Sequence, residues 1–275
     1  MKKILSSLLI VTVCFSLVGC QNSNKSSSSN GQNKVRMNGS TSMEKLVNGL
    51  SEVIREEYPD LLVEPQFTGS SAGIESLING TTDIGTSSRA LTEEEQAKGI
   101  VGHVVAIDGI AIITNPSNTL DGISKEALIA IYQGTIRNWS QLGGPNQPIV
   151  VIGREAGSGT RGAFEEILDV VDTCSYAQEV NETGAVVAKV ASIPGAIGYV
   201  SLDVIGETTK ALEIDNVKIS EETIKDGSYK IQRPFIMATK GSLEEQNESI
   251  QEVFTFIDSE KGQKLIASVG LVSGK

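Results

Sequence analysis

Along the chain, the spacing of apolar residues alternates between the period of a helix and the period of a strand. Apolar residues three or four positions apart predict helices over 42–58, 72–79, 124–132, 162–171, 184–191 and 242–268, with another opening at Thr92. Short apolar runs predict strands over 35–37, 61–67, 83–85, 103–114, 148–153, 197–200 and 233–239. Strands that alternate with helices indicate an α/β fold with a mainly parallel sheet.

The length of the chain, 275 residues, suits one large or two modest domains, and about 240 ordered residues in this alternating pattern suit two α/β lobes. We expect the chain to cross between two α/β lobes in the strands at 107–114 and 233–239, with a break in the first at Asp108-Gly109. One lobe would then hold residues 36–113 and 235–275, and the other 114–234. Two crossings imply a ligand cleft between the lobes and a hinge beneath it.

The N-terminal segment is typical of an export signal rather than of a folded element. Two lysines precede the apolar stretch 4–18, which ends in the letters LVGC. This ending resembles a bacterial lipobox, so we expect removal of residues 1–19 and a lipid on Cys20; an ordinary signal peptide with an incidental cysteine is the alternative. Residues 21–34 have no apolar side chain, and we interpret 20–34 as a lipidated flexible tether. The predicted location is the outer face of the cell membrane.

Composition narrows the possible partners. The net charge of −11 predicts no basic face, which argues against nucleic acid. One histidine and three cysteines leave little for a metal cluster, and we expect neither metal nor cofactor. Once Cys14 is removed and Cys20 carries lipid, Cys174 has no disulfide partner and is expected to be structural.

The sequence offers little support for an enzyme. Gly157-Ser158-Gly159 is not a G-x-S-x-G nucleophile motif, and His103, the single histidine, lies in an apolar strand as a packed or edge residue. The segment after Arg154 lacks the Gly-Lys-Ser/Thr ending of a P-loop.

Four turns rich in glycine, serine and threonine each precede a predicted helix: 39–42 (GSTS), 69–73 (GSSAG), 86–89 (TSSR) and 157–160 (GSGT). The start of a helix offers unpaired N–H groups and partial positive charge, and hydroxyls add further donors. Arg154 can add a forked, charge-assisted pair of hydrogen bonds. Any one such turn is more often a simple helix cap, but four in one chain favour a site for a small oxyanion.

Other polar residues have simpler interpretations. Arg89 and Arg161 are expected to form ion pairs at the surface or the hinge. Glu93–Glu95 is expected to be a solvated helix start, with Thr92 and Glu95 forming a capping box. Trp139 is expected to pack beneath a turn rather than to stack on a sugar.

Taken together, seven segments resemble the phosphate-binding lipoproteins of the bacterial ABC phosphate importer. They are 39–42 (GSTS), 69–74 (GSSAGI), 83–89 (DIGTSSR), 112–118 (IITNPSN), 131–144 (IYQGTIRNWSQLGG), 154–164 (REAGSGTRGAF) and 196–201 (AIGYVS). The resemblance implies a two-lobed periplasmic-binding-protein fold of type II that closes on its ligand. The implied partners are inorganic phosphate, permease subunits with a cytoplasmic ATPase, and the membrane through the lipid, and the implied binding subunit is a monomer. The implied phosphate-binding residues are Thr41, Ser42, Ser70, Ser88, Arg154, Ser158, Gly159 and Thr160.

One position departs from the family. Better-known members carry an aspartate where this chain has Ser88, and that aspartate accepts a proton from bound phosphate and helps to reject sulfate. Ser88 can accept a hydrogen bond but carries no charge; Glu155 is a possible substitute, unless it points away or pairs with Arg154. We therefore predict a phosphate-binding protein, with two alternatives: a protein for another oxyanion such as sulfate or molybdate, and an adhesin or signalling lipoprotein on the same fold.

Overall fold

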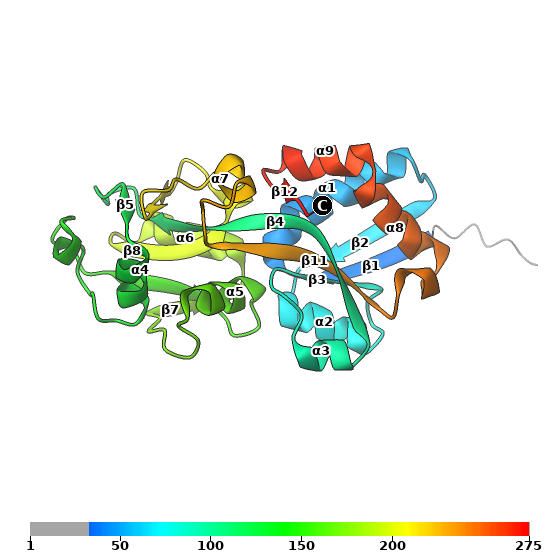
Figure 1. The fold of residues 1–275 in the computed structure, drawn as a ribbon, viewed down its shortest axis with the longest axis horizontal. Helices are drawn as coiled ribbons and strands as arrows, with labels where there is room; N and C mark the ends of the chain where they lie inside the picture. Colours follow the sequence, from blue (N-terminus) through cyan, green and yellow to red (C-terminus); the bar gives the residue numbers. More distant parts are fainter. Residues whose placement is uncertain (1–32, 275) are drawn as a thin grey trace, which may run out of the picture. The chain divides into compact units, whose positions relative to one another are not determined.

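A computed structural model describes residues 33–274 of the chain (Figure 1). The predicted signal peptide, Cys14 and Cys20 lie outside the described residues. The first strand begins at Asn33, so the last two residues assigned to the tether belong to a strand. Among residues 33–274, no helix combines the length and the apolar character needed to span a bilayer.

The strands are β1 (Asn33–Gly39), β2 (Leu61–Gln66), β3 (Ile84–Ser87), β4 (Ile100–Thr114), β5 (Gly122–Ile123), β6 (Val150–Arg154), β7 (Gln178–Val180), β8 (Ala196–Ser201), β9 (Lys210–Ala211), β10 (Glu213–Ile214), β11 (Gln232–Lys240) and β12 (Val272–Ser273). The α-helices are α1 (Glu44–Val53), α2 (Ser70–Ile78), α3 (Glu93–Ala97), α4 (Lys125–Tyr132), α5 (Gly159–Leu168), α6 (Thr183–Ser192), α7 (Glu221–Lys225), α8 (Glu248–Asp258) and α9 (Glu260–Ser268). Short 3-10 helices include Thr41–Met43, Trp139–Leu142 and Leu202–Val204. The predicted capping box of Thr92 and Glu95 is confirmed at the start of α3.

The main sheet has the order β2-β1-β3-β11-β4-β8-β6-β7 in the described residues, and β9 and β12 also pair with β4. The pairs among β2, β1 and β3 are parallel, as are those among β8, β6 and β7. The middle of the sheet is antiparallel, so the expectation of a mainly parallel sheet is wrong there. The physical reason is the path of the chain: β4 leads from one half of the sheet to the other, and β11 returns beside it in the opposite direction (Figure 1).

The expected break at Asp108-Gly109 is also wrong, because β4 is one continuous strand from Ile100 to Thr114. Asp108 stays in the ladder directly opposite Arg233 of β11, and Gly109 lies opposite Gln232. An aspartate followed by a glycine inside an apolar segment predicts a turn. Here Arg233 on the neighbouring strand compensates the charge of Asp108, so the strand continues.

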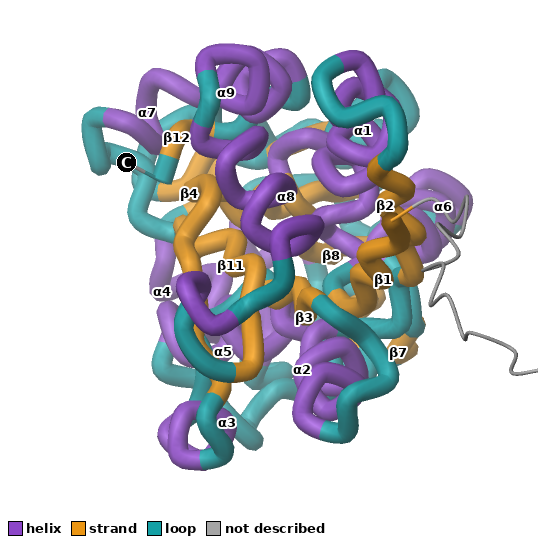
Figure 2. Tube along the Cα trace, turned by 90° about the vertical axis from the view of Figure 1, so that its right-hand side faces the viewer, coloured by secondary structure: helices purple, strands orange, loops and turns teal. Residues whose placement is uncertain are grey.

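Apolar side chains form two large cores. One contains Phe254, Phe256 and Leu50, where α1, α8 and α9 pack on β1, β2 and the first half of β4; Figure 2 shows these three helices on the same side of the strands. The other core is drawn from residues 110–231, including Trp139 and Phe164. A smaller cluster packs α2 on the opposite face of β11. β4 and the chain at β11 supply residues to both large cores, as expected of crossing strands, whereas the exact lobe boundaries stay a prediction.

Candidate functional site

The hydroxyl-rich turns lie where strands end and helices begin. The turn at 39–42 follows β1, that at 86–89 follows β3, and that at 157–160 follows β6 and opens α5; the turn at 69–73 opens α2. The seven predicted site residues with side chains are each at most 5% exposed, and Gly159 is buried too. The structure therefore gathers polar groups inside the protein, where each needs a hydrogen-bonding partner.

Arg154, the last residue of β6, is at the centre of this group and is 1% exposed. Its Nη1 donates to Thr183 Oγ1 at 3.1 Å and its Nη2 donates to Thr41 Oγ1 at 3.1 Å. The same guanidinium also donates to the carbonyls of Val180 and Asn181, at 3.2 and 2.8 Å. Burial lowers the pKa of Arg154 from its usual value, yet an arginine stays charged in a protein. The site thus holds a permanent buried positive charge that faces hydroxyl groups.

Glu155 pairs with Arg154 rather than pointing away from it. Its Oε1 lies 3.4 Å from Arg154 Nη2, and its side chain is 29% exposed. Its second oxygen, Oε2, is buried and has no hydrogen-bond partner within residues 33–274. The carboxylate therefore compensates part of the guanidinium charge from one side.

Hydroxyls from opposite ends of the sheet meet beside Arg154. Ser42 Oγ lies 2.7 Å from Thr160 Oγ1 and 3.0 Å from Thr183 Oγ1. Thr41 Oγ1 lies 3.0 Å from Thr183 Oγ1. Thr41 and Ser42 precede α1, whereas Thr160 and Thr183 lie at the starts of α5 and α6. The site is consequently built jointly by the segments that form the two large cores.

Ser70 and Ser88 lie against the start of α5. Ser40 donates to Ser88 Oγ at 2.8 Å, and the Ser88 N–H donates to Ser70 Oγ at 3.2 Å. A Cβ placed on Gly159 would lie 2.3 Å from Ser70 Oγ and 2.8 Å from Ser88 Oγ. These serines therefore approach the backbone of α5 closely, and only glycine leaves room for them.

Ser158 has a different position from the other predicted residues. Its side chain accepts the Arg161 N–H at 3.3 Å and caps α5. This is the capping role that competes with ligand binding for any such turn. The capped helix start nevertheless lies within the cluster of buried hydroxyl side chains around Arg154, because Gly159 and Thr160 follow Ser158 directly.

Sequence reasoning missed Ser40, Thr183 and the Asn181 carbonyl. Ser40 lies inside the hydroxyl-rich turn at 39–42, in which only Thr41 and Ser42 were predicted as site residues. Thr183 is the first residue of α6 and is followed by Gly184. The letters ETG at 182–184 are thus a further turn of the same kind, and they were the available signal.

The other singled-out residues have structural roles. Arg89 pairs with Glu95 and Arg161 with Glu165, both at 2.8 Å, which confirms the expected ion pairs. Glu95 is therefore held by Arg89, rather than being only part of a solvated helix start. Trp139 is fully buried and donates to the Gly195 carbonyl at 3.0 Å, so it packs beneath its turn as predicted.

Two further polar side chains lie outside the cluster of hydroxyl side chains around Arg154. His103 packs its ring edge-on against Phe254, at 4.8 Å between ring centroids. Cys174 is a half-buried free thiol. His103 thus has the packed position expected of it, whereas a structural role for Cys174 stays a prediction.

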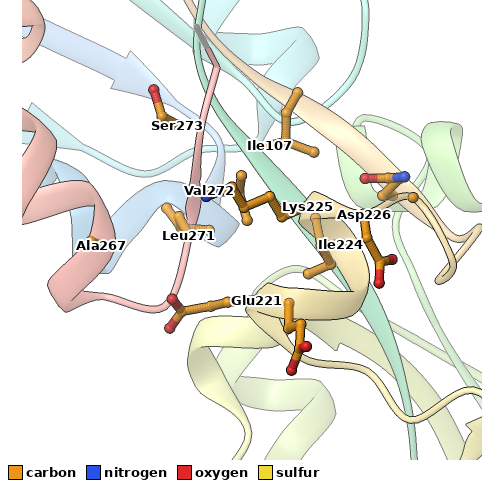
Figure 3. A pocket seen from close by; sticks show the side chains of 12 residues that line it. Ile107, Glu221, Ile224, Lys225, Asp226, Ala267, Leu271, Val272 and Ser273 are labelled. Carbon is orange, nitrogen blue, oxygen red and sulfur yellow. The ribbon is translucent and has the colours of Figure 1, made fainter.

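The chemistry of the site favours an anion. The hydroxyls, the guanidinium and the helix starts supply hydrogen-bond donors, and Glu155 takes up only one side of the Arg154 guanidinium. A separate cavity of about 940 Å³ lies between α7 and β12, beside Ile107 of β4 (Figure 3). That cavity is lined by Glu221, Glu222 and Asp226 against Lys225, so its charge disfavours an anion. In residues 33–274 no three metal-ligating side chains come together.

Comparison with known proteins agrees with this assignment of the fold. The model of the PBP superfamily domain matches residues 24–261. The phosphate-binding protein PstS of Bacillus subtilis (strain 168) is 32% identical over 98% of this chain and 93% of its own length. A crystal structure from Clostridium perfringens, described as a phosphate ABC transporter substrate-binding protein with bound phosphate, is 36% identical with a TM-score of 0.85, covering 88% of this chain and all of that one. An ABC-type phosphate transport receptor from Vibrio cholerae is 32% identical with a TM-score of 0.72, over 87% of this chain and 99% of its own.

The α/β architecture with a mixed sheet, together with these structural relatives, defines a protein with the type II periplasmic-binding-protein fold. The chain belongs to the PBP superfamily and, within it, to the family of the phosphate-binding protein PstS.

Proposed function

We propose that this protein captures inorganic phosphate outside the cytoplasmic membrane and delivers it to an ABC permease. The observation that supports the proposal most directly is the buried guanidinium of Arg154, with hydroxyls from three separate helix starts around it. Buried phosphate needs a donor for each of its oxygens, and this arrangement supplies neutral donors together with one fixed positive charge. The names of the related proteins point to the same ligand.

In this proposal the phosphate-binding residues are Thr41, Ser42, Ser70, Ser88, Arg154, Ser158, Gly159 and Thr160, and the structure adds Thr183. Phosphate oxygens would replace the hydrogen bonds that the hydroxyls now make with one another. Because both large cores contribute to the site, opening and closing of the predicted lobes about β4 and β11 would admit and hold the ion. No residue in this scheme performs bond chemistry, so the protein acts as a binding subunit rather than an enzyme.

The proposal includes attachment to the membrane. Cleavage before Cys20 and lipidation of its sulfur would anchor the folded part at the outer face of the membrane through the segment before β1. The binding subunit would work as a monomer that meets the permease, since the site is complete within one chain.

A second candidate is a binding protein for another oxyanion, such as sulfate or molybdate. The observation in its favour is that Ser88, an uncharged residue, stands at the position beside Ser70 and Gly159. A site without a charged acceptor at this position would suit a fully ionised anion at least as well as a protonated one.

Isothermal titration of residues 21–275, freed of carried-over ligand, tests the two candidates. We expect phosphate to bind with micromolar or tighter affinity at pH 6 and pH 8, with sulfate much weaker. Arg154→Ala should abolish phosphate binding in a chain that remains folded by circular dichroism. Comparable sulfate or molybdate binding would select the second candidate, and unchanged phosphate affinity in folded Arg154→Ala would remove the site assignment.

A further inference from the structure

A buried ion pair connects the two crossing strands directly behind the anion site. Arg233 of β11 and Asp108 of β4 are partners in the antiparallel ladder. Arg233 Nε and Nη2 donate to Asp108 Oδ2 at 3.0 and 2.9 Å, and the two side chains are 1% and 0% exposed. Neither residue belongs to the hydroxyl-rich turns, and nothing in the proposed binding scheme so far uses them.

The remaining polar atoms of these two side chains form hydrogen bonds at the ends of two other strands. Arg233 Nη1 donates to the Ser88 carbonyl, just beyond β3, at 3.1 Å. Asp108 Oδ1 accepts from Ser201 Oγ at 2.7 Å and from the Leu202 N–H at 3.2 Å, at the end of β8. The pair thus joins the end of β3 to the end of β8 through the two strands between them.

Ser88 is held from three directions as a result. Its carbonyl accepts from Arg233, its N–H donates to Ser70 Oγ, and its own hydroxyl accepts from Ser40. The carbonyl lies beyond the last residue of β3, where the ladder supplies no donor, so Arg233 satisfies it. Without the hydrogen bond from Arg233 Nη1, the backbone at Ser88 could rotate, and the Ser88 hydroxyl would no longer face Ser70 and Gly159.

We propose that Arg233 and Asp108 are positioning residues for the anion site, and that by fixing Ser88 they favour a protonated oxyanion over a fully ionised one. The inference rests on the proposed function. Its chemical basis is that Arg154 only donates hydrogen bonds, whereas the hydroxyl of a protonated phosphate needs an acceptor. Ser88 Oγ has lone pairs that can accept that hydrogen when its orientation is fixed. Sulfate has no proton to place at neutral pH, so it gains nothing from the same orientation.

The cost of changing the pair depends on whether one charge or both are removed. Replacing a buried ion pair by apolar side chains of similar volume is often neutral for stability, whereas removing one partner leaves the other charge buried and unpaired. Two variants follow from this contrast. Arg233→Lys keeps a cation for Asp108 but lacks the planar fork that reaches Ser88. The double variant Asp108→Val/Arg233→Met removes both charges together and leaves neither one unpaired.

The test is isothermal titration of residues 21–275 with phosphate and with sulfate, for the wild type, both variants and Arg36→Lys. Arg36→Lys is a control. Arg36 forms an ion pair with Asp83 at 2.8 Å, and this pair lies outside the cluster of hydroxyl side chains around Arg154. We expect phosphate affinity to fall at least tenfold in Arg233→Lys and in the double variant. Sulfate affinity should change by less than threefold, and Arg36→Lys should behave as the wild type. Thermal melting establishes which variants are folded.

Several results would overturn the inference. Wild-type phosphate affinity in either folded variant would show that the pair does not position Ser88. An equal loss for phosphate and sulfate would show a structural role without selectivity, and failure of both variants to fold would assign the pair to folding alone. The proposed function fails by a separate result, namely a wild-type protein that does not bind phosphate.

Discussion

Gly159→Ala is the sharpest test of the way the site is assembled. The added Cβ would lie 2.3 Å from Ser70 Oγ and 2.8 Å from Ser88 Oγ, whereas ordinary contact begins near 3.4 Å. Ser70 is the first residue of α2 and Ser88 directly follows β3, while Gly159 is the first residue of α5. A methyl group at this position therefore keeps apart segments that the site needs together.

The structure sets the size of the effect. Relieving the overlap requires a displacement of roughly 1 Å, because the van der Waals contact distance must be restored. The same displacement would move Ser70 and Ser88 away from the start of α5 and carry two or three donors beyond hydrogen-bonding range of a phosphate ion bound between them. Loss of two or three hydrogen bonds at about 1 kcal/mol each is a loss of about 2–3 kcal/mol, or roughly 30- to 150-fold in phosphate affinity. In the ligand-free chain the same overlap lowers stability, and the preference of alanine over glycine in a helix, up to about 1 kcal/mol, offsets part of that loss.

Isothermal titration with phosphate measures this loss, and thermal melting without ligand measures the stability. Gly184→Ala is the matched control, because Gly184 also lies in the first turn of a helix but an added Cβ there meets nothing within 4 Å. The control should bind phosphate as the wild type does. If Gly159→Ala binds phosphate with wild-type affinity, Ser70 and α5 do not come together around the ligand, and the proposed assembly of the site is refuted.

Three further predictions concern stability, the site and the core. Burial and the nearby charge of Asp108 raise the pKa of Asp203 to about 6, so its ionised form destabilises the folded chain as pH rises through 6. Asp203→Asn should therefore increase the free energy of unfolding at pH 8 by up to about 3 kcal/mol and lose this advantage below about pH 4, as measured by urea denaturation at both pH values. Thr183→Val keeps the shape of the side chain but removes the hydroxyl that accepts from Arg154; phosphate affinity should fall about tenfold by titration, and the melting temperature of the ligand-free chain should also fall because a buried donor loses its acceptor. Phe164→Ala removes a fully buried ring stacked on another aromatic residue and should cost about 3–5 kcal/mol in denaturant unfolding.

The helices and the marked turns could be predicted because their signals are local. A serine or threonine before an apolar period indicates a helix start, and the turns before α1, α2 and α5 were found in this way. The two-residue strands β5, β9, β10 and β12, the three-residue strand β7 and the five-residue helix α7 were missed because they are too short to show a period.

The ion pair of Asp108 and Arg233 could not be predicted, for a different reason. The two residues are 125 positions apart, and only the antiparallel register of β4 and β11 brings them together. Read alone, Asp108-Gly109 is typical of a turn, and Arg233 stands before a proline without any visible partner. Direction and register of strands depend on the whole path of the chain, and the same limit explains the error about the mainly parallel sheet.

The two large cores also differ in when the chain can complete them. The core that contains Phe164 comes from one continuous stretch, 110–231, whose ends are joined by a hydrogen bond from the Ile110 N–H to the Ile231 carbonyl at 2.8 Å. The other combines residues from both sides of that stretch, from Val35 to Leu271. Contacts between residues far apart in sequence form late, because closing a long loop costs entropy. Strand β1, which leads into Thr41 and Ser42, is thus synthesised before the Phe164 core, yet its own core is complete only once α8 and α9 have been added.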